Sequence, residues 1–185
     1  KFWREREKEL VDKLHIQATT DQLTGIYNRR VIFEALDEAM ENSKQSKDRQ
    51  FATIMFDIDF FKQVNDNYGH AGGDAVLVSF AKLLQTEISS PNIVGRIGGE
   101  EFLAILYLSP DEAKEFCAKL IKKINNNVVN FEGTDIKVSS SGGVAFSTET
   151  ETSADLTNKA DERLYDAKKD GRNRFKLIDS ELVGD

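Results

Sequence analysis

The spacing of apolar and polar positions along the chain predicts helices packed on a central sheet. Residues 51–58 are apolar at nearly every position, which is typical of a central strand that is covered on both faces. Apolar runs at 93–94 and 102–108 are separated by a segment that contains Gly98 and Gly99. These runs predict a hairpin, because a two-residue primed turn needs positive φ at both central positions and glycine adopts such values readily.

Helical spacing and further strand-like runs account for most of the remaining chain. Helices are expected over residues 1 to about 18, through Phe33, Leu36 and Met40, over 60–69 and 71–88, from 109 to 124, and from 153 to 171. The helix at 109–124 begins with a capping box and a proline at its first position. Further strands are expected at 128–131, 136–146 and 175–178, and Gly142 and Gly143 indicate a bulge or a close approach.

The first helix differs in character from the rest of the chain. Residues 1–19 are dense in alternating charge and carry an imperfect heptad-like seam of Trp3, Leu10 and Leu14. This pattern is typical both of a solvated helix and of a coiled-coil stub, and both interpretations stay open. We therefore divide the chain into a helical linker at 1–19, one domain at 20–178 and a frayed tail at 179–185. Since the chain begins within a helical pattern and without Met, we expect it to be part of a longer protein.

Composition and charge narrow the function. The 185 residues are 39% hydrophobic and 31% charged, which describes an ordinary globular domain. The net charge of −7 argues against a general nucleic-acid or membrane binder, but it leaves room for a small anionic substrate on a local cationic patch. Cys117 is the single cysteine, so the chain has no disulfide framework or cysteine zinc site, and its apolar helical neighbours indicate a core role. No apolar run approaches the roughly 18 residues of a membrane span.

Carboxylates gather at two predicted strand ends. Asp57 and Asp59 close the buried strand, a position where metal and phosphate chemistry often lies in α/β proteins. Glu100 and Glu101 follow the glycine pair, where the missing side chains let a ligand approach the backbone. Two like charges ~4 Å apart repel by about 4 kcal/mol at an effective dielectric near 20, so adjacent carboxylates favour a bound cation. Taken alone, a DxD pattern and a charged hairpin tip also occur on surfaces without a ligand.

Five motifs together resemble the GGDEF family of diguanylate cyclases, and the resemblance covers about residues 20–178. In the family's order they are DQLTGIYNRR (21–30), FDIDFFKQVND (56–66), GHAGGD (69–74), RIGGEEF (96–102) and AKKDGRN (167–173). The resemblance implies an α/β (α+β) palm-like fold with a central, mostly antiparallel five-stranded sheet flanked by helices. It also implies condensation of two GTP molecules into cyclic di-GMP with release of two pyrophosphates.

The resemblance assigns a role to each matching position. Asp57, Glu100 and the carbonyl of Ile58 match the metal ligands, and such hard oxygen donors favour Mg²⁺ or Mn²⁺ over zinc. Glu100 also matches the catalytic group that assists deprotonation of the attacking 3′-hydroxyl, with Glu101 as its catalytic neighbour. The matching substrate contacts are Asn65 and Asp74 for guanine, Lys62, Lys168 and Arg172 for the triphosphate, and Phe61, Gly98 and Gly99 beside the nucleotide.

The same resemblance implies the partners. GTP is the expected substrate, and a homodimer is expected because each 3′-hydroxyl must reach the α-phosphorus of the other nucleotide. We also expect an upstream sensory or regulatory domain and no nucleic-acid partner. A cytoplasmic location is implied for the catalytic domain, and a membrane anchor further upstream stays open.

Many family members carry Arg-x-x-Asp shortly before the glycine pair, where product binds and arrests the enzyme. Residues 89–92 here read Ser-Ser-Pro-Asn, so Ser89 and Asn92 replace the arginine and the aspartate. Serine lacks the planar donor fork of arginine, and asparagine lacks the charge of aspartate, so we expect no inhibitory product site.

Three other interpretations account for part of the pattern. A catalytically inactive GGDEF module that signals through GTP or a partner is the main alternative, and the conforming GGEEF residues argue against it. A cyclase with a mixed adenine–guanine product is disfavoured by the retained Asp74. A receiver domain, suggested by Asp57 and Asp59, leaves the glycine hairpin unexplained.

Overall fold

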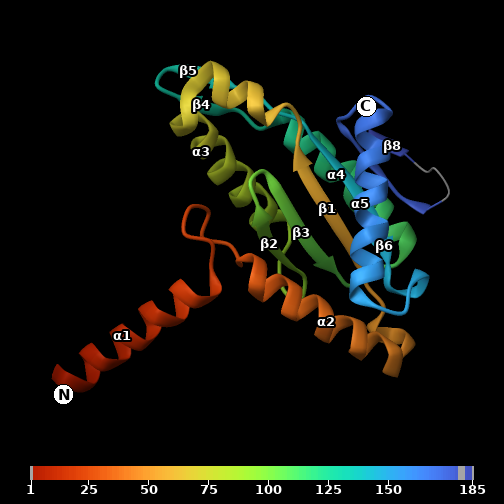
Figure 1. Ribbon diagram of the computed structural model, residues 1–185, viewed down its shortest axis with the longest axis horizontal. Helices are drawn as coiled ribbons and strands as arrows, with labels where there is room; N and C mark the ends of the chain where they lie inside the picture. Colours follow the sequence, from red (N-terminus) through yellow and green to blue (C-terminus); the bar gives the residue numbers. More distant parts are fainter. Residues whose placement is uncertain (1, 179–181, 185) are drawn as a thin grey trace.

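The chain folds into a central sheet with helices on both faces (Figure 1). The computed structural model describes residues 2–178 and 182–184. The helices are α1 (Phe2–Thr19), α2 (Arg29–Gln45), α3 (Phe61–Glu87), α4 (Pro110–Asn126) and α5 (Ser153–Lys169), with short 3₁₀ turns η1 (Lys47–Arg49) and η2 (Ser147–Glu149). The strands are β1 (Ala52–Ile58), β2 (Ile93–Gly98), β3 (Glu101–Leu106), β4 (Val129–Phe131), β5 (Thr134–Ile136), β6 (Ser140–Phe146), β7 (Arg174–Lys176) and β8 (Leu182–Gly184).

The main sheet has six strands in the order β2-β3-β1-β6-β7-β8. Its pairings are antiparallel except between β6 and β7, so the first five strands form the mostly antiparallel sheet that the resemblance implied. The sixth strand comes from the tail, and the expectation of a frayed tail is therefore wrong for residues 182–184. They pair with β7, which would otherwise leave its backbone groups open at the sheet edge. Residues 179–181 and 185 lie outside the described part of the chain.

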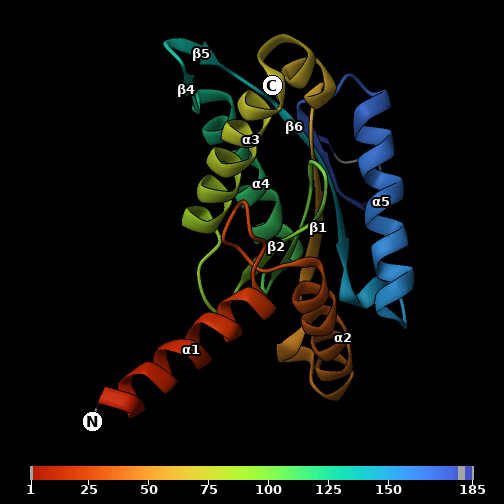
Figure 2. The same cartoon turned by 60° about the vertical axis from the view of Figure 1, so that its left-hand side comes forward.

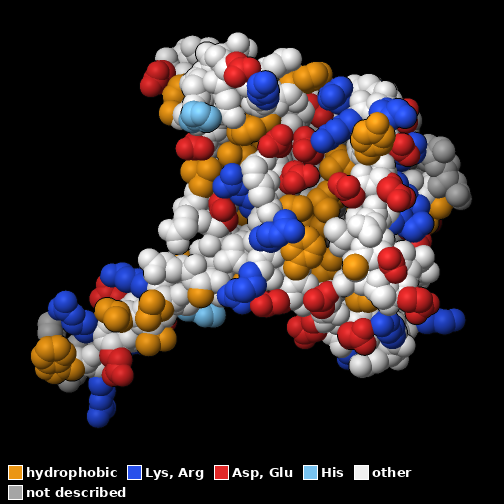
Figure 3. All heavy atoms as spheres, in the orientation of Figure 1, with side chains coloured by type: hydrophobic (Ala, Val, Ile, Leu, Met, Phe, Trp, Pro, Cys, Tyr) orange, Lys and Arg blue, Asp and Glu red, His pale blue; other side chains and the backbone are white. Residues whose placement is uncertain are grey.

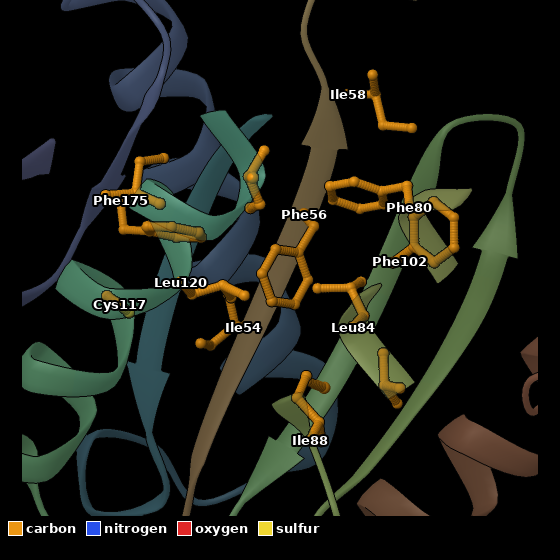
Figure 4. Close-up of a cluster of buried hydrophobic side chains, with 14 of the residues drawn as sticks. Ile54, Phe56, Ile58, Phe80, Leu84, Ile88, Phe102, Cys117, Leu120 and Phe175 are labelled. Atoms are coloured by element: carbon orange, nitrogen blue, oxygen red, sulfur yellow. The ribbon is translucent and has the colours of Figure 1, made fainter. Parts of the chain in front are cut away.

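Alternate residues of β1 face opposite helical layers, as the period of a strand requires. Ile54 and Phe56 pack with α3 and α4 in the larger core, and Met55 packs with α2 and α5 in the smaller one. Figure 4 shows the larger core, where the rings of Phe56, Phe80 and Phe102 lie edge to face with centroids 6.4 and 5.1 Å apart. The middle strand is thus covered on both faces, as predicted, and its end is held rigidly.

The predicted strand over residues 136–146 is confirmed for Ser140–Phe146, but its beginning is wrong, because Ile136 belongs to a different sheet. Residues 134–136 pair with β4 in a separate hairpin, and the chain then crosses to the main sheet, where β6 begins at Ser140. The register of β6 is continuous, so its glycines mark a close approach and not a bulge. A Cβ on Gly142 would lie 2.2 Å from the Phe175 ring, and one on Gly143 would lie 1.9 Å from the Ala160 carbonyl oxygen.

Two further features agree with the sequence analysis. Cys117 lies in the larger core, and burial raises the pKa of its thiol to about 12, so it is an inert packing residue. α1 extends away from the sheet and its covering helices (Figures 1 and 2). Across residues 2–178 and 182–184, none of the helices combines the length and the apolar character needed to cross a membrane.

Candidate active site

The end of β1 and the glycine hairpin lie side by side in the sheet. Asp57 is opposite Glu101 in the register of β1 and β3, and the Ile58 N–H donates to the Glu100 carbonyl oxygen over 3.3 Å. Both strands are fixed by the cores on either face of the sheet. The fold therefore brings the backbone of Ile58 and the carboxylates expected from two distant motifs to one place.

The hairpin turn lies one residue later than predicted. Gly98 is the last residue of β2 and pairs with Glu101, so the turn consists of Gly99 and Glu100. The register shifts between Arg96 and Gly98, and an extra residue on one strand moves the turn along the chain. Gly98 and Gly99 both have positive φ, at 157° and 48°, but Glu100 is not among the described residues with positive φ. The hairpin and the positive φ of both glycines are therefore confirmed, whereas the predicted turn with Gly98 and Gly99 as its two central residues is wrong.

Arg96 connects the hairpin turn to the segment after α1. Arg96 Nε donates to the Gly99 carbonyl oxygen at 2.9 Å, and its guanidinium lies 3.1 Å from Asp21 Oδ1 in the segment after α1. Burial alone would raise the pKa of Asp21, but hydrogen bonds from Thr24 and Arg96 hold that pKa below its ordinary value. This role of Arg96 was not predicted, although the place of Arg96 in the RIGGEEF motif was a signal for one.

The carboxylates at this end of the sheet repel one another. Burial raises the pKa of Asp57; the Lys168 ammonium, 3.0 Å from Oδ2, lowers it in part, and Glu100 and Asp59 raise it again. Burial also raises the pKa of Glu101, and the charge of Asp57 adds to that rise. The cluster thus carries more negative charge than Lys168 neutralises, which favours a further cation. Figure 3 shows acidic and basic side chains gathered around the tip of β1, between α3 and α5.

The donor atoms suit a hard divalent cation. Asp57 and Glu100 supply carboxylate oxygens and Ile58 supplies a carbonyl oxygen, all of which Mg²⁺ and Mn²⁺ accept. Within the described residues, no group of three or more His, Cys, Asp or Glu side chains is arranged to hold a metal ion. Mg²⁺ commonly completes its coordination with water and substrate phosphate oxygens. The residues present therefore fit an ion that binds together with a triphosphate.

The two residues expected to recognise guanine lie on the two halves of α3. The two predicted helices are confirmed as the halves of α3, which are separated by a kink at Gly69, where φ is 71° and ψ is 173°. The halves pack closely, because a Cβ on Gly73 would lie 1.9 Å from Asn65 Oδ1 and 3.2 Å from the Phe61 ring. Asp74 follows Gly73 directly and lies inside the helix, not at its cap. The GHAGGD glycines thus let Asn65 approach the backbone beside Asp74.

The cations expected to contact a triphosphate come from α5, the loop that follows it and α3, beside the tip of β1 (Figure 1). Lys168 lies in the last turn of α5 and pairs with Asp57. Arg172 lies in the following loop, with its guanidinium carbon 4.6 Å from the centroid of the Phe60 ring. Lys62 is exposed in the first turn of α3, where no side chain caps the helix. The open N–H groups of such a turn favour an anion.

The segment that replaces the family's product site is engaged in the fold. The Asn92 side chain accepts a hydrogen bond from the Tyr107 N–H at 2.8 Å. Ser89 and Ser90 border a cavity whose lining residues, Tyr27 among them, are all uncharged. A guanidinium–phosphate contact of the family type therefore has no counterpart in this cavity.

Comparison with known proteins was made by sequence and by structure. The chain matches the family described as "Diguanylate cyclase, GGDEF domain" over residues 18–174. Diguanylate cyclase A of Treponema denticola is 34% identical over 168 residues, which cover 89% of this chain and 45% of that protein. Diguanylate cyclase DgcS of Shewanella oneidensis is 34% identical over 170 residues, covering 92% of this chain and 56% of that protein. The chain thus spans about half the length of these curated relatives.

Solved structures give the same result. The coiled coil and GGDEF domain of DgcB from Caulobacter crescentus, in complex with c-di-GMP, has a TM-score of 0.87 and 26% identity, over 94% of this chain and 93% of that one. Diguanylate cyclase SiaD from Pseudomonas aeruginosa, in complex with its activator SiaC, has a TM-score of 0.84 and 33% identity, over 95% of this chain and 68% of that one.

Proposed function

Because the chain belongs to the GGDEF family of diguanylate cyclases, we propose that it condenses two GTP molecules into cyclic di-GMP. In this reaction the 3′-hydroxyl oxygen of each GTP forms a bond to the α-phosphorus of the other. The bond from each α-phosphorus to its bridging oxygen breaks, and two pyrophosphates leave. The convergence of Asp57 and Glu100 at neighbouring strand ends, beside the Lys168 ammonium, is the observation that carries this proposal.

Carboxylates at the end of the sheet perform the chemistry. Asp57, Glu100 and the Ile58 carbonyl would hold Mg²⁺ or Mn²⁺, which when bound polarises the α-phosphate and balances the charge of the departing pyrophosphate. Glu100 lies in the turn at the tip of the hairpin, and its match to the family motif supports a role in removal of the 3′-hydroxyl proton. Glu101 is its partner in the acidic pair, and the pKa of Glu101 is raised by burial first and by the charge of Asp57 second.

Residues around this centre select and orient the nucleotide. The Asp74 carboxylate accepts from the N–H groups on the guanine edge, and the Asn65 amide pairs with the remaining donors and acceptors. Gly98 and Gly99 leave the hairpin without side chains, so the nucleotide can lie against its backbone. The triphosphate lies among the first turn of α3 with Phe61 and the cations Lys62, Lys168 and Arg172.

A homodimer supplies the second nucleotide. One hairpin holds one GTP, so two half-sites must face each other for in-line attack. α1 supports such pairing, because Leu10 and Leu14 are 57% and 58% exposed at heptad-like spacing on a helix that extends from the domain (Figure 3). We propose that two copies of α1 associate in parallel, under the control of an upstream sensory or regulatory domain. The substrate, GTP, places this activity in the cytoplasm, and no nucleic acid takes part.

Incubation with GTP and Mg²⁺, followed by chromatography of the products, tests the proposed function. We expect cyclic di-GMP and pyrophosphate, and no product when EDTA is in excess. Glu100→Gln should lower turnover by at least about a hundredfold, because it removes both a metal ligand and a proton acceptor. Glu112→Gln, at the exposed cap of α4, is the matched control and should retain full turnover. Undiminished turnover in Glu100→Gln would contradict the mechanism, and GTP binding without any product would favour the inactive signalling module.

A further inference from the structure

Asp59 lies two residues beyond the candidate metal ligand Asp57, but its surroundings are different. It is 3% exposed, and both of its carboxylate oxygens accept hydrogen bonds. Oδ1 accepts from the Ser141 hydroxyl at 2.7 Å, and Oδ2 accepts from the Ser139 hydroxyl at 2.6 Å and the Asn173 N–H at 3.0 Å. A buried carboxylate with three donors is a fixed part of the fold, in contrast to the partly neutralised Asp57.

The Asn173 N–H belongs to the loop between α5 and β7 that carries Arg172. Arg172 and Asn173 have φ values of 63° and 51°, in the left-handed region that residues other than glycine rarely adopt. Such a backbone conformation is costly and persists only where contacts with the surrounding structure stabilise it. Here the Arg172 N–H donates to the Ala167 carbonyl oxygen at 3.0 Å, and the Asn173 N–H donates to Asp59. Asp59 therefore fixes the backbone directly after Arg172.

The residue that follows Asp59 holds the Arg172 side chain itself. The guanidinium carbon lies 4.6 Å from the centroid of the Phe60 ring, within the range of a cation–π contact. Phe60 also has positive φ, at 55°. Two consecutive residues between β1 and α3 thus hold one arginine, Asp59 through the loop backbone and Phe60 through its ring.

We propose that Asp59 is a positioning residue, which holds Arg172 where it meets the β- and γ-phosphates of GTP. This inference rests on the proposed function, in which Arg172 contacts the triphosphate. Arginine has many rotamers, and a guanidinium that is already placed loses less freedom when it binds a phosphate. The DxD pair at the end of β1 therefore combines one carboxylate for the metal with another for the phosphate-binding arginine.

Calorimetry with the unreactive α,β-methylene analogue of GTP, in the presence of Mg²⁺, tests this role. Asp59→Ala should weaken binding of the analogue about tenfold or more, because a charge-assisted contact that orders the loop is lost. Binding of GMP, which lacks the β- and γ-phosphates, should be unchanged. Asp59→Asn should restore most of the affinity, since its amide oxygen can still accept from the Asn173 N–H while its NH₂ group donates to a serine hydroxyl. If Asp59→Ala does not fold, Asp59→Leu fills the site without an acceptor and serves the same purpose.

A double-mutant cycle separates this role from a general loss of structure. In an Arg172→Ala background, Asp59→Ala should cause no further loss of affinity, because Asp59 acts through that arginine. Glu149→Ala is the matched control: this carboxylate is bound to Arg163 at the opposite end of β6, so its loss should lower thermal stability and leave affinity for the analogue intact.

Three results would overturn the inference: an equal loss of GMP binding, additive losses in the cycle, or unchanged affinity in Asp59→Ala while the wild type binds the analogue. A wild type that binds no analogue and makes no product would instead overturn the proposed function, and the inference with it.

Discussion

Replacement of Lys168 should affect metal binding and nucleotide binding in opposite directions. The Lys168 ammonium lies 3.0 Å from Asp57 Oδ2, and the two side chains are 31% and 11% exposed. A divalent cation that binds Asp57 would have to replace this contact. We therefore expect Lys168 to compete with the metal until a triphosphate draws the ammonium away.

The structure sets the expected size of this effect. A hydrogen bond between charged groups contributes about 1.5–3 kcal/mol, and every 1.4 kcal/mol corresponds to roughly tenfold in affinity. A metal ion that binds Asp57 must break the ion pair between Lys168 and Asp57, and it is also repelled by the nearby ammonium. Lys168→Met should thus bind Mn²⁺ about 10- to 100-fold more tightly than the wild type when no nucleotide is present. The same substitution should weaken binding of the GTP analogue, because a triphosphate contact is lost.

Electron paramagnetic resonance of free Mn²⁺ during titration of the nucleotide-free protein measures the first effect directly. Lys169→Met is the matched control, because it removes the same charge from the next residue, whose ammonium lies 5.4 Å from the centroid of the Tyr165 ring and away from Asp57. Its Mn²⁺ affinity should match that of the wild type. Unchanged or weaker Mn²⁺ binding in Lys168→Met, or an equal gain in Lys169→Met, would refute the competition.

Three further predictions concern assembly, regulation and stability. Specific activity should rise with protein concentration and with a fused strong coiled coil, and Leu14→Glu should lower it; activity that stays flat on dilution would argue against dimeric catalysis. Calorimetry of Asp74→Ala with cyclic di-GMP should detect no sub-micromolar site, and binding that maps to 89–92 would show this to be wrong. Burial alone would raise the pKa of Glu149, but Arg163 holds it below its ordinary 4.5, so its stabilisation exists above that value and is lost as the pH falls through the folded pKa. In Glu149→Gln, the free energy of unfolding should therefore decrease less as the pH falls than it does in the wild type, and chemical denaturation at a series of pH values measures this.

Strong periodicity made most of the fold predictable from the sequence. β1 is apolar on both faces because it lies between two cores, and that pattern alone identified it as central. The capping box at Ser109 and Glu112 formed as expected, with both hydrogen bonds present. The motifs also indicated the candidate site. The end of β1 at Asp57 and the hairpin at Glu100 lie side by side in the sheet, although they are far apart in the sequence.

Features that depend on pairing between distant segments were not predictable in this way. The turn of the hairpin is displaced by one residue because the β2–β3 register shifts after Arg96, whose side chain is held by Asp21 from the segment beyond α1. The tail forms β8 because β7 offers it a sheet edge. Each outcome is set by a partner far away in the chain, which the local pattern of residues does not contain.

The two carboxylates of the DxD pair show this limit most clearly. Residues two apart on a strand share a face, so the sequence pattern places Asp57 and Asp59 together. β1 ends at Ile58, however, because its last partner on β6 is Ser140, and the Asp59 N–H then donates to the Ser139 carbonyl oxygen. Asp57 pairs with Lys168 of α5, whereas Asp59, just past the strand end, accepts from the Ser139 and Ser141 hydroxyls and from the Asn173 N–H of the loop after α5. The hydrogen-bond partners beyond the strand end thus distinguish two identical side chains: they favour Asp57 as the candidate metal ligand and Asp59 as a carboxylate that holds the surrounding backbone.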